Sequence, residues 1–481
     1  MGDGLRAEPR LARSGTPATA GIVHLGPGAF FRAFNAAYTH DAMAAAGGDW
    51  GITAVSLRSP TARDQLQPQG GAFTSVTLGP EGSSHQVIES VVRVMVAPED
   101  PVAVVVAMAD PAIRIVSLTV TEKGYCHNPA TGLLNPDHPD VVHDLGNRGA
   151  PRSAPGLIVA ALAQRRAAGI GPFTVLSCDN LPANGALTKG IVIDFARKVD
   201  PTLAEWIEIH VPFPATMVDR ITPATMQADI ERLSESAGYV DPGCVVHEPF
   251  RQWVIEDRFA TGRPDWDVVG AQFVQDVAAH EHMKLRCLNG THSALAYLGY
   301  LAGYDTIAET VADPTFASYC QTLWREEILP TVPTPEGEDL VRYCDGLLAR
   351  YRNPAIRHRT WQIAMDGSQK LPQRLLGTIG DRLATGSVPV GLCLAVAGWM
   401  RYVGGVDEAG QRIDVRDPLA DELKAIASSA TSAAGKVDAL LAVRDVFEPD
   451  LAKDRAFRDM LVDVYGELER DGARAAVAAR G

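Results

Sequence analysis

The chain has 481 residues and a formal net charge of −14, from 44 Lys and Arg against 58 Asp and Glu. This length allows a large buried core, which excludes a chain that is disordered throughout. The acidic balance argues against a general nucleic-acid binder, which needs a basic face, but it is compatible with an anionic substrate held in a local cationic pocket.

The cysteines and the N-terminus indicate the compartment. The seven cysteines are scattered and form no CxxC pair, which argues against a structural zinc site and fits a reducing cytosol. Residues 1–20 are polar, lack the apolar stretch of a signal peptide and are expected to form a loose tail. No run of 18 apolar residues occurs, so we expect a cytoplasmic protein without membrane contact.

Strand-like and helix-like segments alternate through residues 21–279. The residues that follow the first strand at positions 36–43 have apolar side chains at helical spacing. Segment 102–108 fits either a helix or a strand. Such alternation predicts a parallel, doubly wound sheet of the α/β class. The further segments we assign are strands at 21–25, 52–57, 113–120 and 173–177 and a helix at 157–168.

From about residue 280 few β-branched runs remain, and the pattern becomes helical. We therefore expect a second, mostly α-helical domain at 280–481, which would carry the substrate and catalytic residues. Its predicted helices cover 284–300, 315–328, 339–349, 371–384, 390–401, 417–428 and 456–469.

The first strand ends in a glycine turn that is a candidate for binding a dinucleotide. The turn reads Gly26, Pro27, Gly28, Ala29, Phe30, and glycines at this place allow a tight turn and close approach of a pyrophosphate. The third glycine of GxGxxG is missing, so an ordinary strand-to-helix turn is the alternative. The second strand is followed by Arg58 instead of an acidic residue. An arginine there can stack on adenine, meet a 2′-phosphate or simply be solvated, so NAD and NADP both remain open.

The most unusual stretch is Lys284 to His292. On an α-helix Lys284 and His292 lie about 80° apart, and Asn289 about 60° beyond His292, so the three share one broad face. A lysine in an apolar cleft loses part of its preference for the charged form and can act as a base. Asn289 and His292 can bond to a hydroxyl or carbonyl oxygen. The alternative is a surface lysine and a buried structural histidine.

Seven motifs in chain order resemble the polyol-specific long-chain dehydrogenases, the family of mannitol 2-dehydrogenase and fructuronate reductase. The resemblance implies an N-terminal Rossmann-type domain, a helical C-terminal domain and metal-independent hydride transfer with NAD. One departure is visible, because the family's GAFHRAH is GAFFRAF here, with Phe31 and Phe34 in place of histidines. The matching segments are residues 21–33, 117–126, 175–185, 213–223, 248–257, 284–301 and 359–374.

The resemblance also implies roles for single residues. Lys284 would be the general base, and Asn289 and Asn180 would stabilise the developing alkoxide. His292 would orient the substrate, and Asp219 would hold a substrate hydroxyl or position a neighbouring group.

The segment 350–374 bears on the substrate, because it carries six Lys and Arg against one acid, Asp366. Arginine grips a carboxylate with two parallel bonds, and a polyol has no carboxylate. We expect Arg359, His358 and Lys370 to bind substrate and take Arg350, Arg352 and Arg374 as mainly surface cations. The run at 357–374, with 398–408, is more similar to the fructuronate reductases than to the mannitol 2-dehydrogenases.

The sequence therefore predicts an NAD-dependent enzyme, with NADP not excluded, that interconverts D-fructuronate and D-mannonate. The alternatives are a mannitol 2-dehydrogenase and, outside the enzymes, a sensor of NAD or sugar acid. The expected partner is a small sugar acid or polyol, without nucleic acid or membrane, and the chain would be a monomer or small homo-oligomer.

Overall fold

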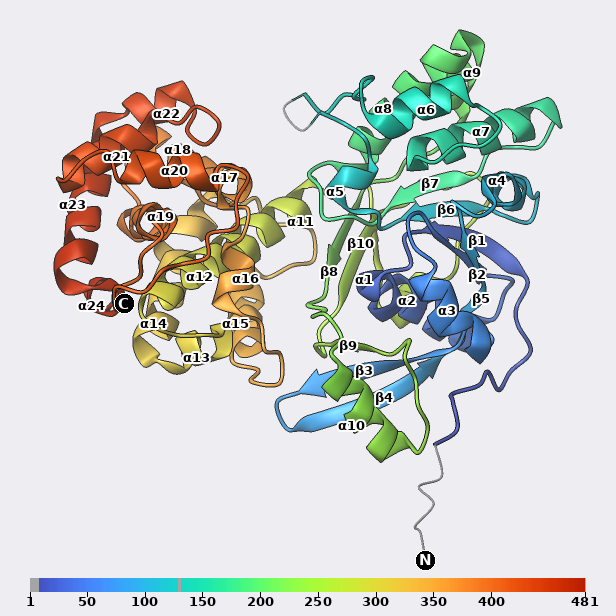
Figure 1. Cartoon of the computed structure of the whole chain (residues 1–481), viewed down its shortest axis with the longest axis horizontal. Coiled ribbons are helices and arrows are strands. Elements are labelled where there is room, and N and C mark those ends of the chain that lie inside the picture. The colour runs from blue at the N-terminus through green and yellow to red at the C-terminus, as the bar shows by residue number, and fades with distance from the viewer. Residues whose placement is uncertain (1–7, 129–130, 481) are drawn as a thin grey trace, which may run out of the picture. The chain divides into compact units, whose positions relative to one another are not determined.

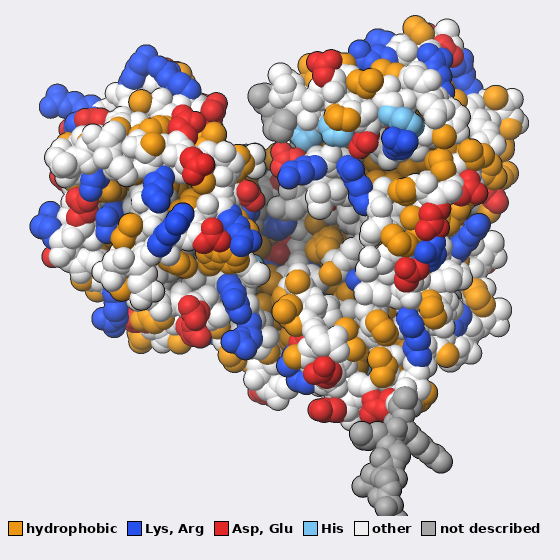
Figure 2. Space-filling model, viewed as in Figure 1, with side chains coloured by type: hydrophobic (Ala, Val, Ile, Leu, Met, Phe, Trp, Pro, Cys, Tyr) orange, Lys and Arg blue, Asp and Glu red, His pale blue; other side chains and the backbone are white. Residues whose placement is uncertain are grey.

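The computed structural model describes residues 8–128 and 131–480. The chain divides into two compact units, Met1–Ala278 and Ala279–Gly481, drawn in blue to green and in yellow to red (Figure 1). The sequence placed this division between residues 279 and 280. On the face drawn in Figure 2, Lys and Arg side chains are interspersed with Asp and Glu. Among the described residues no helix is long and apolar enough to cross a membrane.

The first unit is built on a five-stranded sheet in the order β5-β2-β1-β6-β7. All four strand pairs are parallel. The chain runs outward from β1 to one edge and then returns to the other side of β1, so the strand order reverses beside β1. This is the doubly wound, Rossmann-like arrangement that the sequence predicts, and its ligand crevice lies at that reversal. The strands are β1 (Ala20–Leu25), β2 (Gly51–Ser56), β5 (Val91–Val96), β6 (Ile115–Leu118) and β7 (Thr174–Ser177).

Successive side chains of β1 point to opposite faces of the sheet and pack in two different hydrophobic cores. Val23 and Leu25 pack with the helices α4, α7, α8 and α9, whereas Ile22 packs with α1, α2 and three buried tryptophans. Both faces of the sheet are thus covered, as a parallel sheet requires. The helices of this unit are α1 (Ala29–Ala33), α2 (Asn35–Ala46), α3 (Thr61–Leu66), α4 (Pro101–Ala109), α5 (Thr121–Gly124), α6 (Pro139–Gly146), α7 (Ala154–Ala167), α8 (Asn184–Val199), α9 (Pro201–His210) and α10 (Gln227–Ala237).

Segment 102–108, for which the sequence left helix and strand open, lies in the helix α4. The Asp100 carboxylate caps this helix by accepting a bond of 2.9 Å from the backbone N–H of Ala103. Pro101 occupies the first turn, where its missing N–H costs nothing. The helix start signal at Asp100 and Pro101 therefore indicates a helix, which the hydrophobic periodicity alone did not distinguish from a strand.

Two smaller sheets were not assigned from the sequence. One has the order β4-β3-β9 and the other β11-β10-β8. Their strands are short, or half exposed like β4, so their hydrophobic pattern is weak. The strands are β3 (Phe73–Gly79), β4 (Gly82–Ile88), β8 (Thr216–Asp219), β9 (Val245–His247), β10 (Gln252–Glu256) and β11 (Gln272–Val274).

The expectation of a loose segment at 1–20 is wrong for its described part, and residues 1–7 lie outside the described residues. The backbone N–H of Leu11 donates to Val240 O at 3.0 Å, and the Leu11 side chain is buried. Arg10 and Arg13 reach back to residues 64–70 through their guanidinium groups. Polar composition alone did not reveal these long-range bonds.

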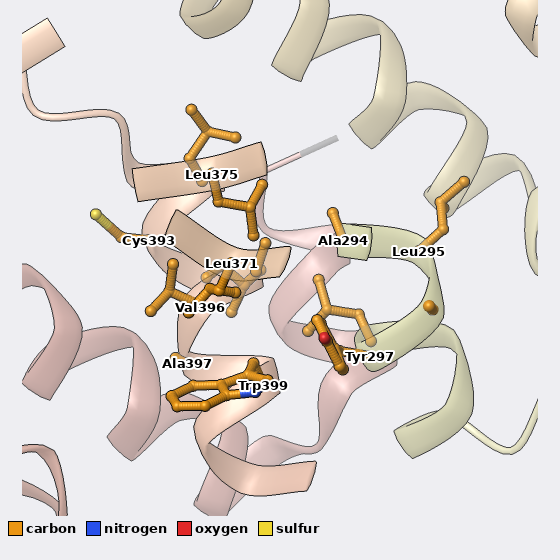
Figure 3. Close-up of a cluster of buried hydrophobic side chains, with 14 of the residues drawn as sticks. Ala294, Leu295, Tyr297, Leu371, Leu375, Cys393, Val396, Ala397 and Trp399 are labelled. Carbon is orange, nitrogen blue, oxygen red and sulfur yellow. The ribbon is translucent and has the colours of Figure 1, made fainter. Parts of the chain in front are cut away.

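The second unit is helical and has one large apolar core. In that core α12 packs on α19, and Tyr297 of α12 lies beside Trp399 of α19 (Figure 3). Gly398 permits this approach, because a Cβ there would lie 2.7 Å from Leu298 Cδ2. The helices are α11 (Ala278–Met283), α12 (Thr291–Leu301), α13 (Ile307–Ala312), α14 (Pro314–Thr322), α15 (Leu340–Tyr351), α16 (Thr360–Ala364), α17 (Gly367–Leu371), α18 (Gly377–Ala384), α19 (Val390–Val403), α20 (Ala420–Ala427), α21 (Ala433–Leu441), α22 (Pro449–Lys453), α23 (Arg455–Asp471) and α24 (Ala473–Ala478).

Candidate functional site

The glycine turn after β1 has the geometry that a bound dinucleotide requires. Gly26 has a φ of +95°, and a Cβ there would lie 2.3 Å from Thr119 O, so only glycine fits. At Gly28 the nearest atom to such a Cβ is 4.0 Å away, so this backbone faces open space that a ligand can approach closely. The two glycines thus serve different purposes, one for the turn and one for access.

His24, on β1 beside this turn, is a residue that the sequence did not single out. Its Nδ1 bonds to Ser117 Oγ and its Nε2 to Thr119 Oγ1, both at 2.8 Å. Burial lowers the pKa of His24 to about 3, so the ring is neutral at physiological pH. Phe31 stacks on it with ring centroids 3.7 Å apart. The departure at position 31 therefore changes packing directly behind the glycine turn.

A pocket of about 580 Å³ opens at this turn, at the carboxyl ends of β1, β2 and β6. Gly26, Gly28 and Arg58 line it, together with Ser56 and Arg152. Ala29 and Phe30, which the sequence grouped with the turn, are not among its described lining residues, and Phe30 instead stacks on Phe34. The pocket carries several cationic side chains, a composition that suits a phosphate-bearing ligand.

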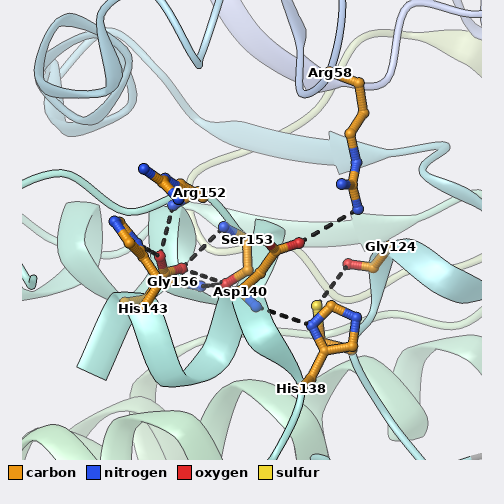
Figure 4. Close-up of polar contacts among 10 residues, drawn as sticks. Arg58, Gly124, His138, Asp140, His143, Arg152, Ser153 and Gly156 are labelled. Atoms are coloured by element: carbon orange, nitrogen blue, oxygen red, sulfur yellow. Dashed lines mark hydrogen bonds and ion pairs between the residues drawn. The ribbon is translucent and has the colours of Figure 1, made fainter. Parts of the chain in front are cut away.

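Arg58 projects into solvent at the edge of this pocket. Its side chain is 74% exposed, and its Nη2 lies 3.3 Å from Oδ2 of Asp140 on α6 (Figure 4). An exposed ion pair of this kind is worth about 0–1 kcal/mol, so a ligand phosphate can displace it. This position fits the uses of Arg58 that the sequence allowed, which are contact with an adenine, with a 2′-phosphate or with solvent.

The ends of β6 and β7 are tied together by Asp179. Its carboxylate accepts bonds of 2.9 Å from the backbone N–H groups of Val120 and Thr121 and one of 2.8 Å from Tyr125 OH. Asp179 is therefore a structural clamp of the loop after β6. The neighbouring Asn180 is exposed at the carboxyl end of β7, where doubly wound sheets present residues to ligands.

Asp219 ends β8 and lies opposite Gln252 of β10, with a side chain that is 3% exposed. Arg220 follows it and donates through Nη1 to Ala33 O at 2.5 Å. Burial, with a contribution from Arg251, lowers the pKa of Arg220 to about 10. Adjacent aspartate and arginine residues are usually solvated at the surface, but Asp219 and Arg220 are not.

In the second unit, Lys284 begins a π-helical segment, Lys284–Gly290, that joins α11 to α12. Its side chain is 8% exposed, that of Asn289 is half-buried and that of His292 is 6% exposed. A π turn rotates less per residue than an α turn. The angles expected from an α-helical wheel therefore do not hold here, although the three residues do lie on one helical run. Such π segments often occur at functional sites.

His292 lies in a cluster of rings and cations. Its ring stacks on Tyr351 at 5.0 Å and meets the His358 ring edge to face at 4.8 Å. Burial, then the cations around it, lower the pKa of both histidines, that of His358 to about 4. Both rings are neutral at physiological pH, and His292 Nε2 and His358 Nδ1 are buried without a bonding partner among the described residues.

Two cations complete this cluster. Lys370 Nζ donates to Met365 O at 2.5 Å, and burial, reinforced by Arg374, lowers its pKa to about 8. Arg374 Nη1 donates to Ser293 Oγ at 3.2 Å, and burial lowers the pKa of its guanidinium. Gly290 lets the Arg374 backbone approach the Lys284 segment, because a Cβ at Gly290 would lie 2.8 Å from Arg374 O.

The expected surface role of Arg374 is therefore wrong, since a further π-helical segment, Pro372–Leu376, turns it inward. Arg359, expected to bind substrate, is exposed at the N-cap of α16. The structure brings together His292, His358, Lys370 and Arg374, and it leaves Arg359 outside this cluster.

Comparisons with known proteins agree with this architecture. Residues 20–268 match the family model of the mannitol dehydrogenase Rossmann domain, and residues 276–469 match that of the mannitol dehydrogenase C-terminal domain. The chain belongs to the mannitol dehydrogenase family. It is an oxidoreductase, and the predicted family and fold class are confirmed.

Two relatives in this family differ in substrate by name. D-mannonate oxidoreductase of Escherichia coli (strain K12) is 48% identical over 462 residues, 95% of each chain. Mannitol 2-dehydrogenase of Phaeosphaeria nodorum (strain SN15) is 40% identical over 464 residues, 95% of this chain and 81% of that protein. A solved structure, the Pseudomonas fluorescens mannitol 2-dehydrogenase in ternary complex with NAD and D-mannitol, has a TM-score of 0.86 and 39% identity, with 98% of this chain and 96% of that one covered.

Proposed function

We propose that this mannitol dehydrogenase family member is an NAD-dependent enzyme that interconverts D-fructuronate and D-mannonate. The observation that carries the proposal is the buried guanidinium of Arg374 beside Lys370 and the two neutral histidines. The E. coli D-mannonate oxidoreductase, at 48% identity over 95% of both chains, supports the same substrate class.

A sugar acid carries a carboxylate, which can pair with the two cations of this cluster. Arg374 uses Nη1 for Ser293, which leaves Nε and Nη2 to grip a carboxylate with two parallel bonds. Lys370 adds a second positive charge below its pKa of about 8. Without an anion these two buried cations repel each other, as the lowering of the Lys370 pKa by Arg374 indicates. A substrate carboxylate relieves this repulsion, whereas a polyol hydroxyl does so only weakly.

The proposed chemistry is removal of a proton and a hydride from one carbinol group. Lys284, as the neutral amine, takes the hydroxyl proton while the carbon loses its hydride, and as the ammonium it returns the proton in the reverse reaction. Its low exposure of 8% removes water that an ammonium prefers, which suits a group that must be neutral for part of the cycle. We assign no metal to this reaction, because the amine and the amide donors supply the proton transfer and the charge stabilisation.

The other residues are assigned by the atoms they offer. The side-chain amides of Asn289 and Asn180 donate to the developing alkoxide. His292 presents its unbonded Nε2 to a substrate hydroxyl and so orients the sugar, with Asp219 accepting from another hydroxyl. His358, next to His292, borders the carboxylate position with Lys370.

The glycine turn fits a dinucleotide, since Gly28 leaves open the space that a Cβ would fill. When bound, NAD supplies the acceptor of the hydride, and its reduced form supplies the hydride for reduction. Gly26 and Gly28 would shape the pyrophosphate position, and Arg58 would lie near the adenosine ribose. The relative solved with NAD supports NAD as the coenzyme, and Arg58 leaves NADP as the second coenzyme to test.

The deciding experiment is a substrate panel measured with both coenzymes. D-mannonate, D-altronate, mannitol, arabinitol and sorbitol are compared by initial rates with NAD and NADP at one pH. We expect mannonate with NAD to have the highest kcat/KM. A clear preference for mannitol over mannonate would refute the proposal and favour a mannitol 2-dehydrogenase, and absence of turnover on every substrate would favour a sensor.

A further inference from the structure

Three potential metal ligands meet at the edge of the dinucleotide pocket. The Cys126 thiol, a ring nitrogen of His138 and a carboxylate oxygen of Asp140 all lie within 4.8 Å of one another. Figure 4 shows His138 and Asp140 of this group. Among the described residues this is the one group of its kind. Cys126 and Asp140 also line the pocket that Gly26 and Arg58 line. Cysteine, histidine and carboxylate form a ligand set that suits Zn²⁺.

The backbone holds these side chains in place. Cys126 has a φ of +55°, a left-handed conformation that non-glycine residues seldom adopt without a compensating reason. The backbone N–H of Asn135 donates to Cys126 O at 2.9 Å, which closes the loop and returns the chain to His138. There Nδ1 of His138 accepts from the backbone N–H of Asp140 at 3.2 Å and caps α6. This bond uses the lone pair of Nδ1, so an ion bound at that nitrogen replaces the backbone N–H of Asp140.

Carboxylates lie close to the Cys126 thiol. A carboxylate oxygen of Asp140 is within 4.8 Å of the sulfur, and Asp144 follows Asp140 one turn later on α6. The same carboxylates stabilise a cation. A divalent ion replaces the thiol proton, which goes to solvent, and it holds the sulfur as thiolate.

The distances require a modest closure. Tetrahedral zinc with bonds of about 2.0–2.3 Å places its ligand atoms about 3.5 Å apart. The three atoms, at most 4.8 Å apart, must therefore close by no more than about 1.3 Å, which side-chain rotation of the half-buried Asp140 and His138 can supply. Water would take the fourth position, as in sites with three protein ligands.

We propose that Cys126, His138 and Asp140 form a zinc-class metal site, and that the ion competes with Arg58 for Asp140. In the metal-free protein Arg58 pairs with Asp140 at 3.3 Å. An ion on Asp140 releases Arg58 toward the pocket. The metal then acts on coenzyme affinity, and by reciprocity the coenzyme acts on metal affinity. This coupling rests on the proposed coenzyme pocket, whereas the metal site does not.

The site is tested by titrating the chelator-treated full chain with Co²⁺, whose thiolate complexes show a charge-transfer absorption, and then displacing it with Zn²⁺. We expect one ion per chain, loss of the absorption in Cys126→Ser, and weaker binding in His138→Ala and Asp140→Asn. Each loss should exceed the about 10–100-fold that removal of an outer-shell partner costs. Cys244→Ser is the matched control, because Cys244 is buried elsewhere in the same unit.

No thiolate absorption in the wild type, or an absorption that Cys126→Ser leaves unchanged, overturns the site. His138→Ala and Asp140→Asn provide the same test if Cys126→Ser does not fold. The coupling is tested separately with Arg58→Ala, which should bind the ion up to about fivefold more tightly, the worth of an exposed ion pair. Metal binding with unchanged NAD affinity, measured by nucleotide fluorescence, would refute the coupling and leave the site standing.

Discussion

Arg374→Gln should damage turnover of sugar acids and leave polyols nearly untouched. The guanidinium has Nε and Nη2 available beside its bond to Ser293. Loss of one bond to a charged group costs about 1.5–3 kcal/mol, so kcat/KM for D-mannonate should fall about 10- to 100-fold and further if both bonds are made. Mannitol has no carboxylate, and its kcat/KM should change by only a few fold. The assay is the initial rate of NAD reduction on both substrates with wild type and variant.

Arg359→Gln is the matched control, because it removes the same group from an exposed position. It should change kcat/KM for mannonate by less than about fivefold, the range of exposed charges. Arg374→Lys keeps the charge without the planar fork and should fall between wild type and Gln. Equal losses on acid and polyol would refute the carboxylate assignment. A larger loss in Arg359→Gln than in Arg374→Gln would give the role to Arg359. Thermal unfolding of each variant shows whether a loss reflects misfolding.

Other predictions concern the base, the metal, pH and packing. Lys284→Ala should lower kcat about 10²–10⁴-fold while NAD still binds, with partial rescue by added primary amines. If the variant keeps most of the wild-type rate at neutral and alkaline pH, Lys284 is not the general base. Treatment with EDTA should leave kcat on mannonate intact at saturating NAD, because the ion proposed at Cys126 acts on coenzyme affinity and takes no part in the reaction. Loss of kcat at saturating NAD would contradict metal-free chemistry. The ratio of kcat/KM for mannonate to that for mannitol should fall as pH rises through about 8, because Lys370 is charged only below its pKa; the same fall in Lys370→Met would contradict this. Gly290→Ala should reduce activity on acids and polyols alike, because its Cβ would lie 2.8 Å from Arg374 O, and a wild-type rate would show that this packing is not needed.

The sequence indicated the glycine turn and four of the five strands of the main sheet because the signals there are local, but it did not assign β5. Gly26 and Gly28 are recognisable from spacing, and their place at the reversal of strand order follows from alternating strands and helices. The small sheets containing β3 and β8 were missed because short, half-exposed strands carry no distinct pattern. The bonds that hold residues 8–19 were missed for another reason, since they join positions more than fifty residues apart.

The site in the second unit was predicted only in part. Lys284, Asn289 and His292 share one helical run, as the spacing indicates, but the π winding changes their angles. The sequence did not single out Arg374 over Arg359, because both lie in one basic segment and their burial depends on whether the chain winds as α16 or as the π segment Pro372–Leu376. No pattern in the sequence distinguishes an outward from an inward arginine there.

The packing at Gly290 connects two segments that carry proposed site residues. The segment Lys284–Gly290 carries the proposed base, and the segment Pro372–Leu376 carries the proposed carboxylate ligand. The two meet where a side chain at Gly290 would collide with the backbone of Arg374. Contact between the two backbones therefore fixes these segments relative to each other inside this unit. If Arg374 holds the substrate carboxylate as proposed, a substitution at position 374 that leaves this contact unchanged should alter the selection between sugar acid and polyol without altering the proposed base.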